Sequence, residues 1–317
     1  MNLDSRPPDI FGIVNLTNLG VIRAFGEDAG QFLQGQLTQD VVGMNLEQAR
    51  LAAFCNPKGR MQASFVVLKQ SSKEILLLCS QDLVAKTVKR LSMFVMRAKV
   101  ELTDATGDFA LYGVVGSAVQ SFTKSSGTPW TKVNLRAGSL AFLYPGAGQQ
   151  RAIWCGSAKS PAPEGERLDL ETWNWLEVQS GVAMVTQPIF EAFVPQMLNY
   201  ESVDGVNFKK GCYPGQEIVA RSQFRGTLKR RAYLVHADAA LEIGQEIFHS
   251  QDADQPCGLV AAAAASSVGG FDAIVSLQTS AAADALVHIG NQRLTAGKAN
   301  GVALALMPLP YLLREDI

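Results

Sequence analysis

One cysteine lies in a run of residues that could make its thiol reactive, the stretch "KKGCYPGQE" that begins at Lys209. Gly211 lets the backbone bend sharply before Cys212, and Pro214 suits the first turn of a helix over "GQEIVARSQF". Cys212 would then lie just before a helix N-terminus, whose partial positive charge stabilises a thiolate. Lys209 and Lys210 act in the same direction. A nucleophilic or redox-active Cys212 is therefore a physically reasonable hypothesis.

A structural interpretation of Cys212 stands beside the reactive one. Small side chains fit tight turns before helices, and many such cysteines are inert. The chain has three histidines, His236, His249 and His288. All three fall in the C-terminal region, so a cysteine–histidine hydrolase has weak support. An acid at Glu217 is favourable through the helix dipole alone, but it could also accept hydrogen bonds from the aminopyrimidine ring of a ligand.

Basic residues are concentrated around the same stretch. Seven lie between positions 209 and 231, where Glu217 is the only acid: Lys209, Lys210, Arg221, Arg225, Lys229, Arg230 and Arg231. Such a cluster could bind a polyanion, or it could be a solvated helix followed by a linker. Aromatic residues for stacking on bases are sparse here, which gives single-stranded RNA recognition little support.

Composition bounds the class of protein. The 317 residues are 47% hydrophobic and 18% charged with a formal net charge of -1, which indicates a globular chain and no general affinity for polyanions. The five cysteines are scattered, so neither a disulfide framework nor a protein-only metal site is expected. No apolar run is long enough for a membrane span and no signal peptide is visible, so we expect a soluble cytoplasmic protein that does not bind membranes.

Hydrophobic patterning predicts the elements that position these residues. Strands are expected over 21–25, 50–55, 61–68, 75–79 and 99–103, with helices from about residue 28 and after residue 80. A second unit of the same style begins near "FALYGVVG", and the helix "LDLETWNWLEVQSG" carries Trp173 and Trp175. From Arg231 onward, short strands that include "ALVHIG" alternate with turns, which predicts a small β-barrel or sandwich.

The stretch "KKGCYPGQE" resembles the K-G-C-[FY]-x-G-Q-E signature of the YgfZ family, folate-binding proteins related to the aminomethyltransferase of the glycine cleavage system. Further stretches look like the family's as well: "FLQGQLTQDV", "FCNPKGRM", "FVPQMLNYESVDGVNFKKGCY" and "PLPYLL". The resemblance spans essentially the whole chain.

The resemblance implies an α+β fold with three domains in a ring around a central channel. Two of the domains are α+β and interleaved in sequence, and the third is a C-terminal β-barrel. We expect the first domain to comprise residues 1–48 with 107–205, the second 49–106 with 206–227, and the barrel 228–317.

The resemblance also implies a ligand, tetrahydrofolate, bound in the channel. Two tryptophans contribute to folate binding in a bacterial member of the family. One corresponds to Trp173, and the other corresponds to Leu19, where the aromatic side chain is missing. The signature supplies the remaining expected folate-binding residues: Lys210, Gly211, Tyr213, Gln216 and Glu217.

One departure separates this chain from the aminomethyltransferases. Those enzymes carry an Asp-Asp pair whose first carboxylate positions folate for methylene transfer, whereas the matching positions here are Ala63 and Ser64. Aminomethyltransferase activity is therefore not expected. The signature cysteine, Cys212, is a residue that those enzymes lack.

The family role implied by the resemblance is support for iron–sulfur cluster assembly or repair, and thereby for methylthiolation of some tRNAs, with Cys212 essential. Expected partners are folate and iron–sulfur enzymes such as a tRNA methylthiotransferase, with tRNA itself a further candidate. Two alternatives stay open. One is a folate-dependent one-carbon transferase acting directly on tRNA or protein through Cys212, and the other is a non-catalytic folate sensor. Whether the protein is an enzyme also stays open.

Overall fold

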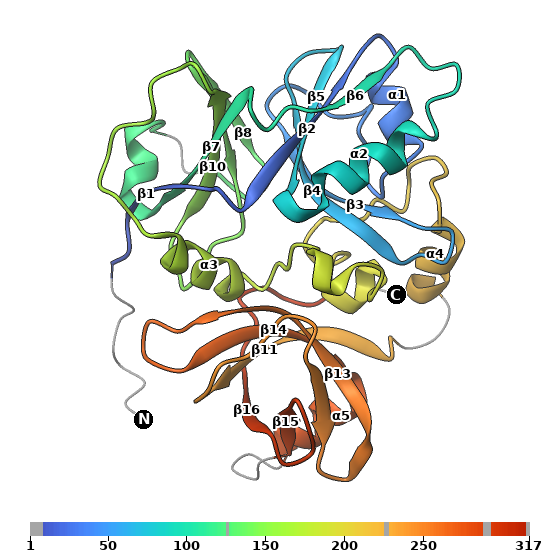
Figure 1. Cartoon of the computed structure of the whole chain (residues 1–317), viewed down its shortest axis with the longest axis vertical. Coiled ribbons are helices and arrows are strands. Elements are labelled where there is room, and N and C mark those ends of the chain that lie inside the picture. Colours follow the sequence, from blue (N-terminus) through green and yellow to red (C-terminus); the bar gives the residue numbers. More distant parts are fainter. Residues whose placement is uncertain (1–8, 125–126, 225–227, 288–292, 315–317) are drawn as a thin grey trace.

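The computed structural model describes residues 9–124, 127–224, 228–287 and 293–314. The chain forms three lobes, two built on five-stranded sheets and a third built on a barrel (Figure 1). The two sheet lobes lie side by side and the barrel lies below both of them. Within the described ranges, no helix has the length and apolar character that crossing a membrane requires.

The first sheet is antiparallel and contains the N-terminal strand. Its strands run in the order β1 (Gly12–Asn15), β7 (Phe109–Val115), β10 (Arg151–Ser157), β9 (Gly138–Phe142) and β8 (Lys132–Leu135). The helix α3 (Leu170–Gln179) lies between this sheet and the barrel (Figure 1). The first sheet therefore carries the tryptophan-bearing helix that the sequence singled out.

The second sheet has the order β3 (Ala49–Cys55), β4 (Met61–Lys69), β5 (Glu74–Ser80), β2 (Leu19–Phe25) and β6 (Glu101–Asp104). Its central strands are buried on both faces, which explains their nearly continuous apolar sequence. The short helix α1 (Ala29–Gln34) contacts β5, and α2 (Val84–Ser92) packs on β2 and β6.

Sheet membership differs from the predicted grouping of residues 1–48 with 107–205. β1 does pair with β7, but β2 pairs with β5 and β6 in the second sheet. The chain crosses from one sheet to the other between Asn15 and Leu19. The backbone N–H of Leu16 still donates to the carbonyl of Leu111 in β7 of the first sheet, whereas Leu19 pairs with Ser80 in β5 of the second sheet. Residues 19–34 thus belong with 49–106. The wider division into domains stays a prediction.

The C-terminal domain is a closed barrel, as the resemblance implied, where the strand pattern alone had left a sandwich open. Its order is β11 (Arg230–Ala237), β14 (Phe271–Gln278), β13 (Asp252–Ala265), β12 (Glu246–His249), β15 (Leu294–Ala296) and β16 (Val302–Met307). The expected strand "ALVHIG" was wrong in its first part, where the helix α5 (Thr279–Val287) continues. Alanine is the best helix former, and five of the nine residues of α5 are alanine or leucine. The rest of that stretch lies outside the described residues.

Local signals explain where α3 begins and ends. Asp169 caps the helix by accepting a hydrogen bond from the backbone N–H of Thr172 at 2.5 Å, and this bond holds the pKa of Asp169 below its usual value. Gly181 follows the C-cap with φ +68, a conformation that glycine adopts at little cost.

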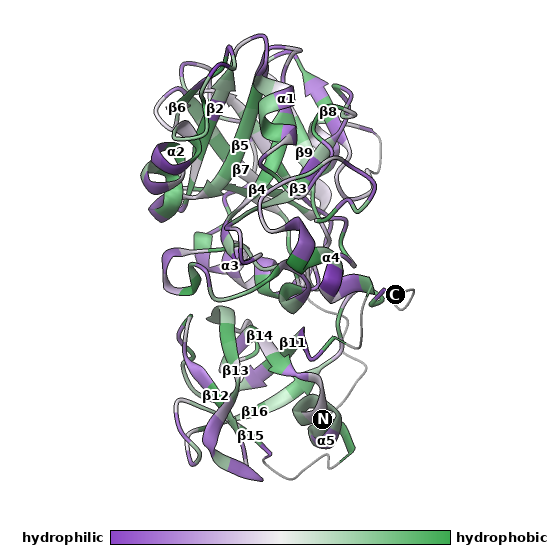
Figure 2. Cartoon of the chain, turned by 90° about the vertical axis from the view of Figure 1, so that its right-hand side faces the viewer, coloured by the Kyte–Doolittle hydropathy of each residue, from purple (hydrophilic) through white to green (hydrophobic). Residues whose placement is uncertain are grey.

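Figure 2 shows hydrophobic interior strands, such as β5 and β7, and a largely hydrophilic α2 on the outside.

Candidate functional site

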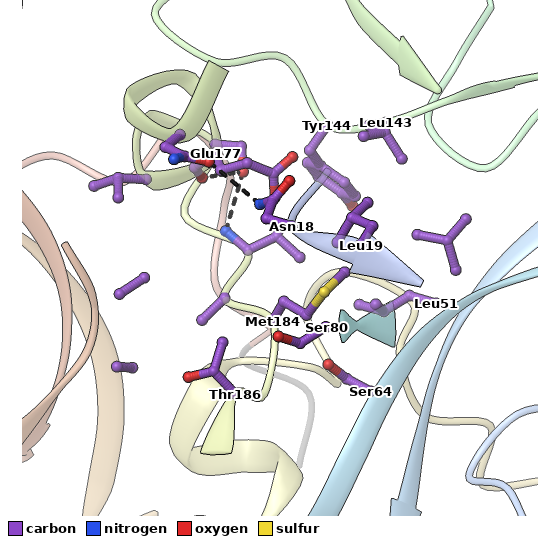
Figure 3. A pocket seen from close by; sticks show the side chains of 18 of the residues that line it. Asn18, Leu19, Leu51, Ser64, Ser80, Leu143, Tyr144, Glu177, Met184 and Thr186 are labelled. Carbon is purple, nitrogen blue, oxygen red and sulfur yellow. Dashed lines mark hydrogen bonds between the residues drawn. The ribbon is translucent and has the colours of Figure 1, made fainter. Parts of the chain in front are cut away.

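A cavity of about 250 Å³ lies where the three lobes meet. The second sheet contributes Leu19 and Ser64, the first sheet contributes Arg151, and the barrel contributes Ala261 to Ala263 of β13. The helix α3 supplies much of the remaining wall (Figure 3). Pockets between domains are common places for small-molecule sites. We call this space the central cavity.

Trp173 of α3 is held rigidly at the edge of the central cavity. It is 1% exposed, and its ring lies against β7 where Gly113 leaves space. A Cβ atom at Gly113 would lie only 2.4 Å from the Trp173 ring. The guanidinium carbon of Arg151 lies 4.5 Å from the ring centroid on the cavity side. Trp173 therefore lines the site and also belongs to the core.

A buried ion pair places a carboxylate in the central cavity. Arg151 is 1% exposed and donates to Oε1 of Glu177 and, at 3.2 Å, to the carbonyl of Tyr144. Burial lowers the pKa of Arg151 to about 9, which leaves it protonated at neutral pH. The Glu177 side chain is 30% exposed, and its Oε2 makes no hydrogen bond to any residue that the structure describes. Glu177 can therefore receive donors from a ligand.

Other polar groups in the cavity are neutral. Asn18 donates to Asn174 at 3.4 Å, and Ser64 accepts from the backbone N–H of Val185 at 2.8 Å. The buried hydroxyl of Thr186 has no partner among the described residues. Buried polar atoms are normally paired, so an orphan hydroxyl in a cavity is a ready contact for a ligand. An amide pair, one carboxylate and several hydroxyl-bearing residues, among them Ser64, Ser80 and Thr186, thus line the mostly apolar cavity (Figure 3).

The structure brings together two of the predicted folate-binding residues and separates the others. Leu19 and Trp173 both line the central cavity, whereas the five residues predicted from the signature do not. The Glu217 side chain is 85% exposed and pairs with Arg221 at 3.4 Å, as expected from the helix dipole and an i,i+4 pair alone. Sequence reasoning missed Glu177, Arg151, Asn18 and Thr186. Nothing local distinguishes these residues, because their contacts span up to 156 positions in sequence.

The signature forms a separate, well-anchored loop. Lys210 donates to the carbonyls of Gln34 and Leu37, at and just beyond the end of α1, the latter at 2.7 Å. Its ammonium also lies 4.9 Å from the ring of the buried Tyr213. Burial lowers the pKa of Lys210 to about 8. Lysine is favourable at a helix C-terminus, so this contact fixes the loop to α1.

Gly215 docks the other side of the signature loop onto the "NPKG" turn. Its φ is +80, and a Cβ there would lie 2.4 Å from the carbonyl oxygen of Asn56. No larger residue fits this approach without movement. Two stretches quoted for the family resemblance are thus in direct contact, although Asn56 and Gly215 are far apart in sequence.

Cys212 is exposed on this anchored loop, whereas the other four cysteines are buried. The following helix, α4 (Gln216–Phe224), begins one residue after the start of the predicted stretch "GQEIVARSQF" and four residues after Cys212. The basic cluster does not form one free surface. Arg231 is buried against Glu201 at 2.7 Å, and Arg230 donates to the carbonyl of Cys257 at 3.0 Å. Arg225 lies outside the described residues.

The described ranges contain no group of three or more His, Cys, Asp or Glu side chains arranged to hold a metal ion.

Comparisons with known proteins agree on one family. Residues 9–133 match the model of the GCVT N-terminal domain. A "tRNA-modifying protein YgfZ" from Colwellia psychrerythraea is 32% identical over 236 residues, which cover 71% of each chain. Another protein of that name, from Edwardsiella ictaluri, is 28% identical and covers 92% of this chain and 89% of its own.

A solved structure shares the fold. The glycine cleavage system aminomethyltransferase T from Bartonella henselae superposes with a TM-score of 0.60, covering 95% of this chain and 86% of that enzyme, at 12% sequence identity. At this identity the likeness concerns the fold alone. The sequence relatives extend over most of their own length. Together with the signature quoted above, these matches show that the chain belongs to the YgfZ family.

Proposed function

We propose that this protein binds a reduced folate, tetrahydrofolate, in the central cavity and supports the modification of tRNA by iron–sulfur enzymes. The observation that carries the folate part is the Glu177 carboxylate, held by Arg151 within apolar and aromatic walls. The tRNA part is carried over from relatives named tRNA-modifying proteins. Cys212 is the functional thiol in this proposal.

The residues present fit the pteridine ring of a folate. Its aminopyrimidine edge carries adjacent N–H donors, which a carboxylate such as Glu177 can accept. Binding pockets usually measure about 300–1,000 Å³, so a cavity of about 250 Å³ fits the ring system rather than a whole folate. Thr186, Asn18 and Asn174 offer the remaining polar contacts. When bound, the folate would supply one-carbon or redox chemistry that the side chains lack.

The position of Cys212 favours an accessory role over direct one-carbon transfer. The thiol is exposed on the signature loop and does not line the central cavity. Transfer from a ring-bound one-carbon unit to Cys212 would require the reacting atoms to approach within about 3–3.5 Å. An exposed thiol on an anchored loop is instead accessible to a macromolecular client.

An iron–sulfur cluster would be cargo shared with a client enzyme. Clusters are held by about four thiolates, and Cys212 supplies one. The client would provide the other ligands. Cys212 could act as a transient cluster ligand or as a redox thiol during cluster repair, and its exposure is consistent with either role.

Complementation tests this function. In a bacterial strain lacking its own family member, the wild-type gene should restore tRNA methylthiolation and Cys212→Ala should not. The unfolding free energy of Cys212→Ala should stay within about 0.5 kcal/mol of wild type, because exposed positions contribute little. Full rescue by Cys212→Ala would remove the thiol from the proposal. Product formed from methylenetetrahydrofolate and tRNA by the purified protein alone would favour the transferase instead.

A further inference from the structure

A second cavity, of about 320 Å³, lies between α2, β4 and residues 190–191. Lys86 and Arg90 enter it from α2, one turn apart, and Gln62 enters from β4. Phe190 forms an aromatic wall, with the Lys86 ammonium 3.2 Å from its ring centroid. The cavity thus combines two cations with an aromatic surface. No residue of the signature loop contributes to it.

An unpartnered acceptor lies in this second cavity. Gln62 is 8% exposed, and its amide Nε2 donates to Glu191 Oε1 at 2.6 Å. The orientation of the amide is fixed, because a carboxylate only accepts hydrogen bonds. The buried Gln62 Oε1 is therefore an acceptor that has no hydrogen-bond partner among the described residues. The hydrogen bonds from Gln62 and from Asn56 hold the pKa of Glu191 below its usual value, so it stays ionised.

A donor without a hydrogen-bond partner also lies in the second cavity. The buried Nε–H of Arg90 has no such partner in the described part of the chain. Lys86 and Arg90 lie close enough to Glu191 for their charges to help lower its pKa, and the Arg90 guanidinium carbon lies 5.5 Å from the ring centroid of Phe94. Glu191 adopts φ +60, an uncommon conformation for a residue with a side chain. The cavity thus presents cationic donors beside two acceptors. This arrangement complements a group that carries a carboxylate close to an N–H, as a glutamyl unit does.

The second cavity adjoins the central cavity along one strand. Gln62 and Ser64 lie two residues apart on β4, next to a register shift in the pairing of β4 with β3, and Ser64 lines the central cavity. Two residues of a strand span about 7 Å. The segment that follows α3 makes the same connection, because Thr186 lines the central cavity and Phe190 lines the second. A ligand held by its ring in the central cavity could therefore extend a tail past this end of β4 and the segment 186–190.

We propose that the second cavity binds glutamyl carboxylates and takes the γ-linked glutamate tail of the folate. Each γ-glutamyl unit carries a carboxylate for Lys86 and Arg90, and an amide N–H for Gln62 Oε1. The inference rests on the proposed function for the origin of the tail. The match between the second cavity and a glutamyl group does not depend on folate binding. A free γ-glutamyl compound would offer the same carboxylate and N–H groups as the folate tail, and the experiment below distinguishes the two ligands.

Calorimetry tests the inference with three ligands: 5-formyltetrahydrofolate monoglutamate, its triglutamate, and γ-glutamylglutamate. The proteins are wild type, Lys86→Gln/Arg90→Gln and the control Lys89→Gln, which changes an exposed lysine of α2 outside the cavity. Wild type should bind the triglutamate about tenfold more tightly than the monoglutamate, the scale of one or two charge-assisted hydrogen bonds. The ratio should fall to near one in the double variant and persist in Lys89→Gln.

Each outcome decides the inference. Equal affinities for the two folates in wild type, or a preference that survives in the double variant, would overturn the tail site. If neither folate binds wild type, the proposed function fails and γ-glutamylglutamate decides. Saturable binding that the double variant loses would keep the second cavity as a glutamyl site, and no binding would remove it. Lys86→Gln alone, at an exposed position, repeats the comparison should the double variant fold poorly.

Discussion

Cys212 differs from the other cysteines at the scale of a single side chain. Burial raises the pKa of Cys55, Cys79 and Cys155 to about 12, and it raises that of Cys257 as well. These four thiols are protonated and shielded at neutral pH. Cys212 alone is open to solvent. Reactivity at cysteine follows thiolate character and exposure, so chemistry should concentrate at one position.

Thiol titration with a chromogenic disulfide reagent checks this exposure. In the native protein one thiol should react rapidly, and all five should react after unfolding in urea. Cys212→Ser should remove the fast-reacting thiol and leave the four slow ones. Two or more fast thiols in native Cys212→Ser would contradict the burial of the others.

Lys210 predicts a pH dependence of stability. Its pKa is lowered from 10.5 to about 8 by burial, with Asp40 and Cys212 opposing the shift. Between these values the unfolded chain binds more protons than the folded chain, so the contribution of Lys210 to the unfolding free energy rises with pH. The side chain is partly exposed, which reduces the expected rise to about 1 kcal/mol. Lys210→Met should lack this rise in urea unfolding at pH 8 and pH 10. A wild-type to variant difference that is independent of pH would contradict it.

At the scale of elements, the packing of α3 against β7 shapes the central cavity. Gly113→Ala should place a methyl group against the Trp173 ring, because the added Cβ would lie 2.4 Å from it. Overpacking of this kind costs about 1–3 kcal/mol. Gly107→Ala is the matched control, since a Cβ there meets nothing within 4 Å. Urea denaturation should show a lower midpoint for Gly113→Ala only, and equal midpoints would refute this packing.

Elements were more predictable from sequence than the site they build. Alternating and continuous apolar runs predicted the strands of the second sheet, and the pattern around Trp173 predicted α3. The run "ALVHIG" suits a strand by its β-branched residues, yet the alanines before it extend a helix into it. The cation cluster after Lys209 was visible in sequence. In the structure, Lys210 instead donates to a backbone carbonyl and Arg231 pairs with Glu201. These tertiary contacts cannot be predicted from a local sequence pattern.

At the scale of the whole molecule, the barrel is tied to α3 through one buried carboxylate. Asp272 of β14 accepts from Trp175 Nε1 at 2.6 Å and from Gln179 Nε2 at 2.8 Å, and its other oxygen lies 2.7 Å from His236 Nδ1. This junction holds β13 against the central cavity. No residue near Asp272 in sequence reveals these partners, which lie 93 and 97 positions away on α3.

Asp272→Asn should weaken this junction. The amide retains one acceptor and introduces an N–H that faces donors, and such a buried mismatch costs about 1–3 kcal/mol. Asp238→Asn is the control, because Asp238 is fully exposed beside the same histidine. A lower melting temperature for Asp272→Asn only is expected by calorimetry. Equal melting temperatures would show that the junction contributes little.

The cavity itself could not be read from the sequence, because each lobe supplies one part of it. Leu19, Ser64, Glu177 and Ala262 come from four separate regions of the chain. The family resemblance pointed to Leu19 and Trp173, which both line the cavity. The carboxylate of the site comes from Glu177, while Ser64 contributes a hydroxyl to the same cavity.

The most direct test of a folate site between the lobes is the affinity of the purified protein for 5-formyltetrahydrofolate, measured by calorimetry. Wild type and Glu171→Gln, an exposed acid on the same helix, should bind saturably at one site. Glu177→Gln should bind at least about tenfold more weakly, the scale of one lost charge-assisted hydrogen bond. Equal affinity of Glu177→Gln and wild type, or no binding by wild type, would contradict the account.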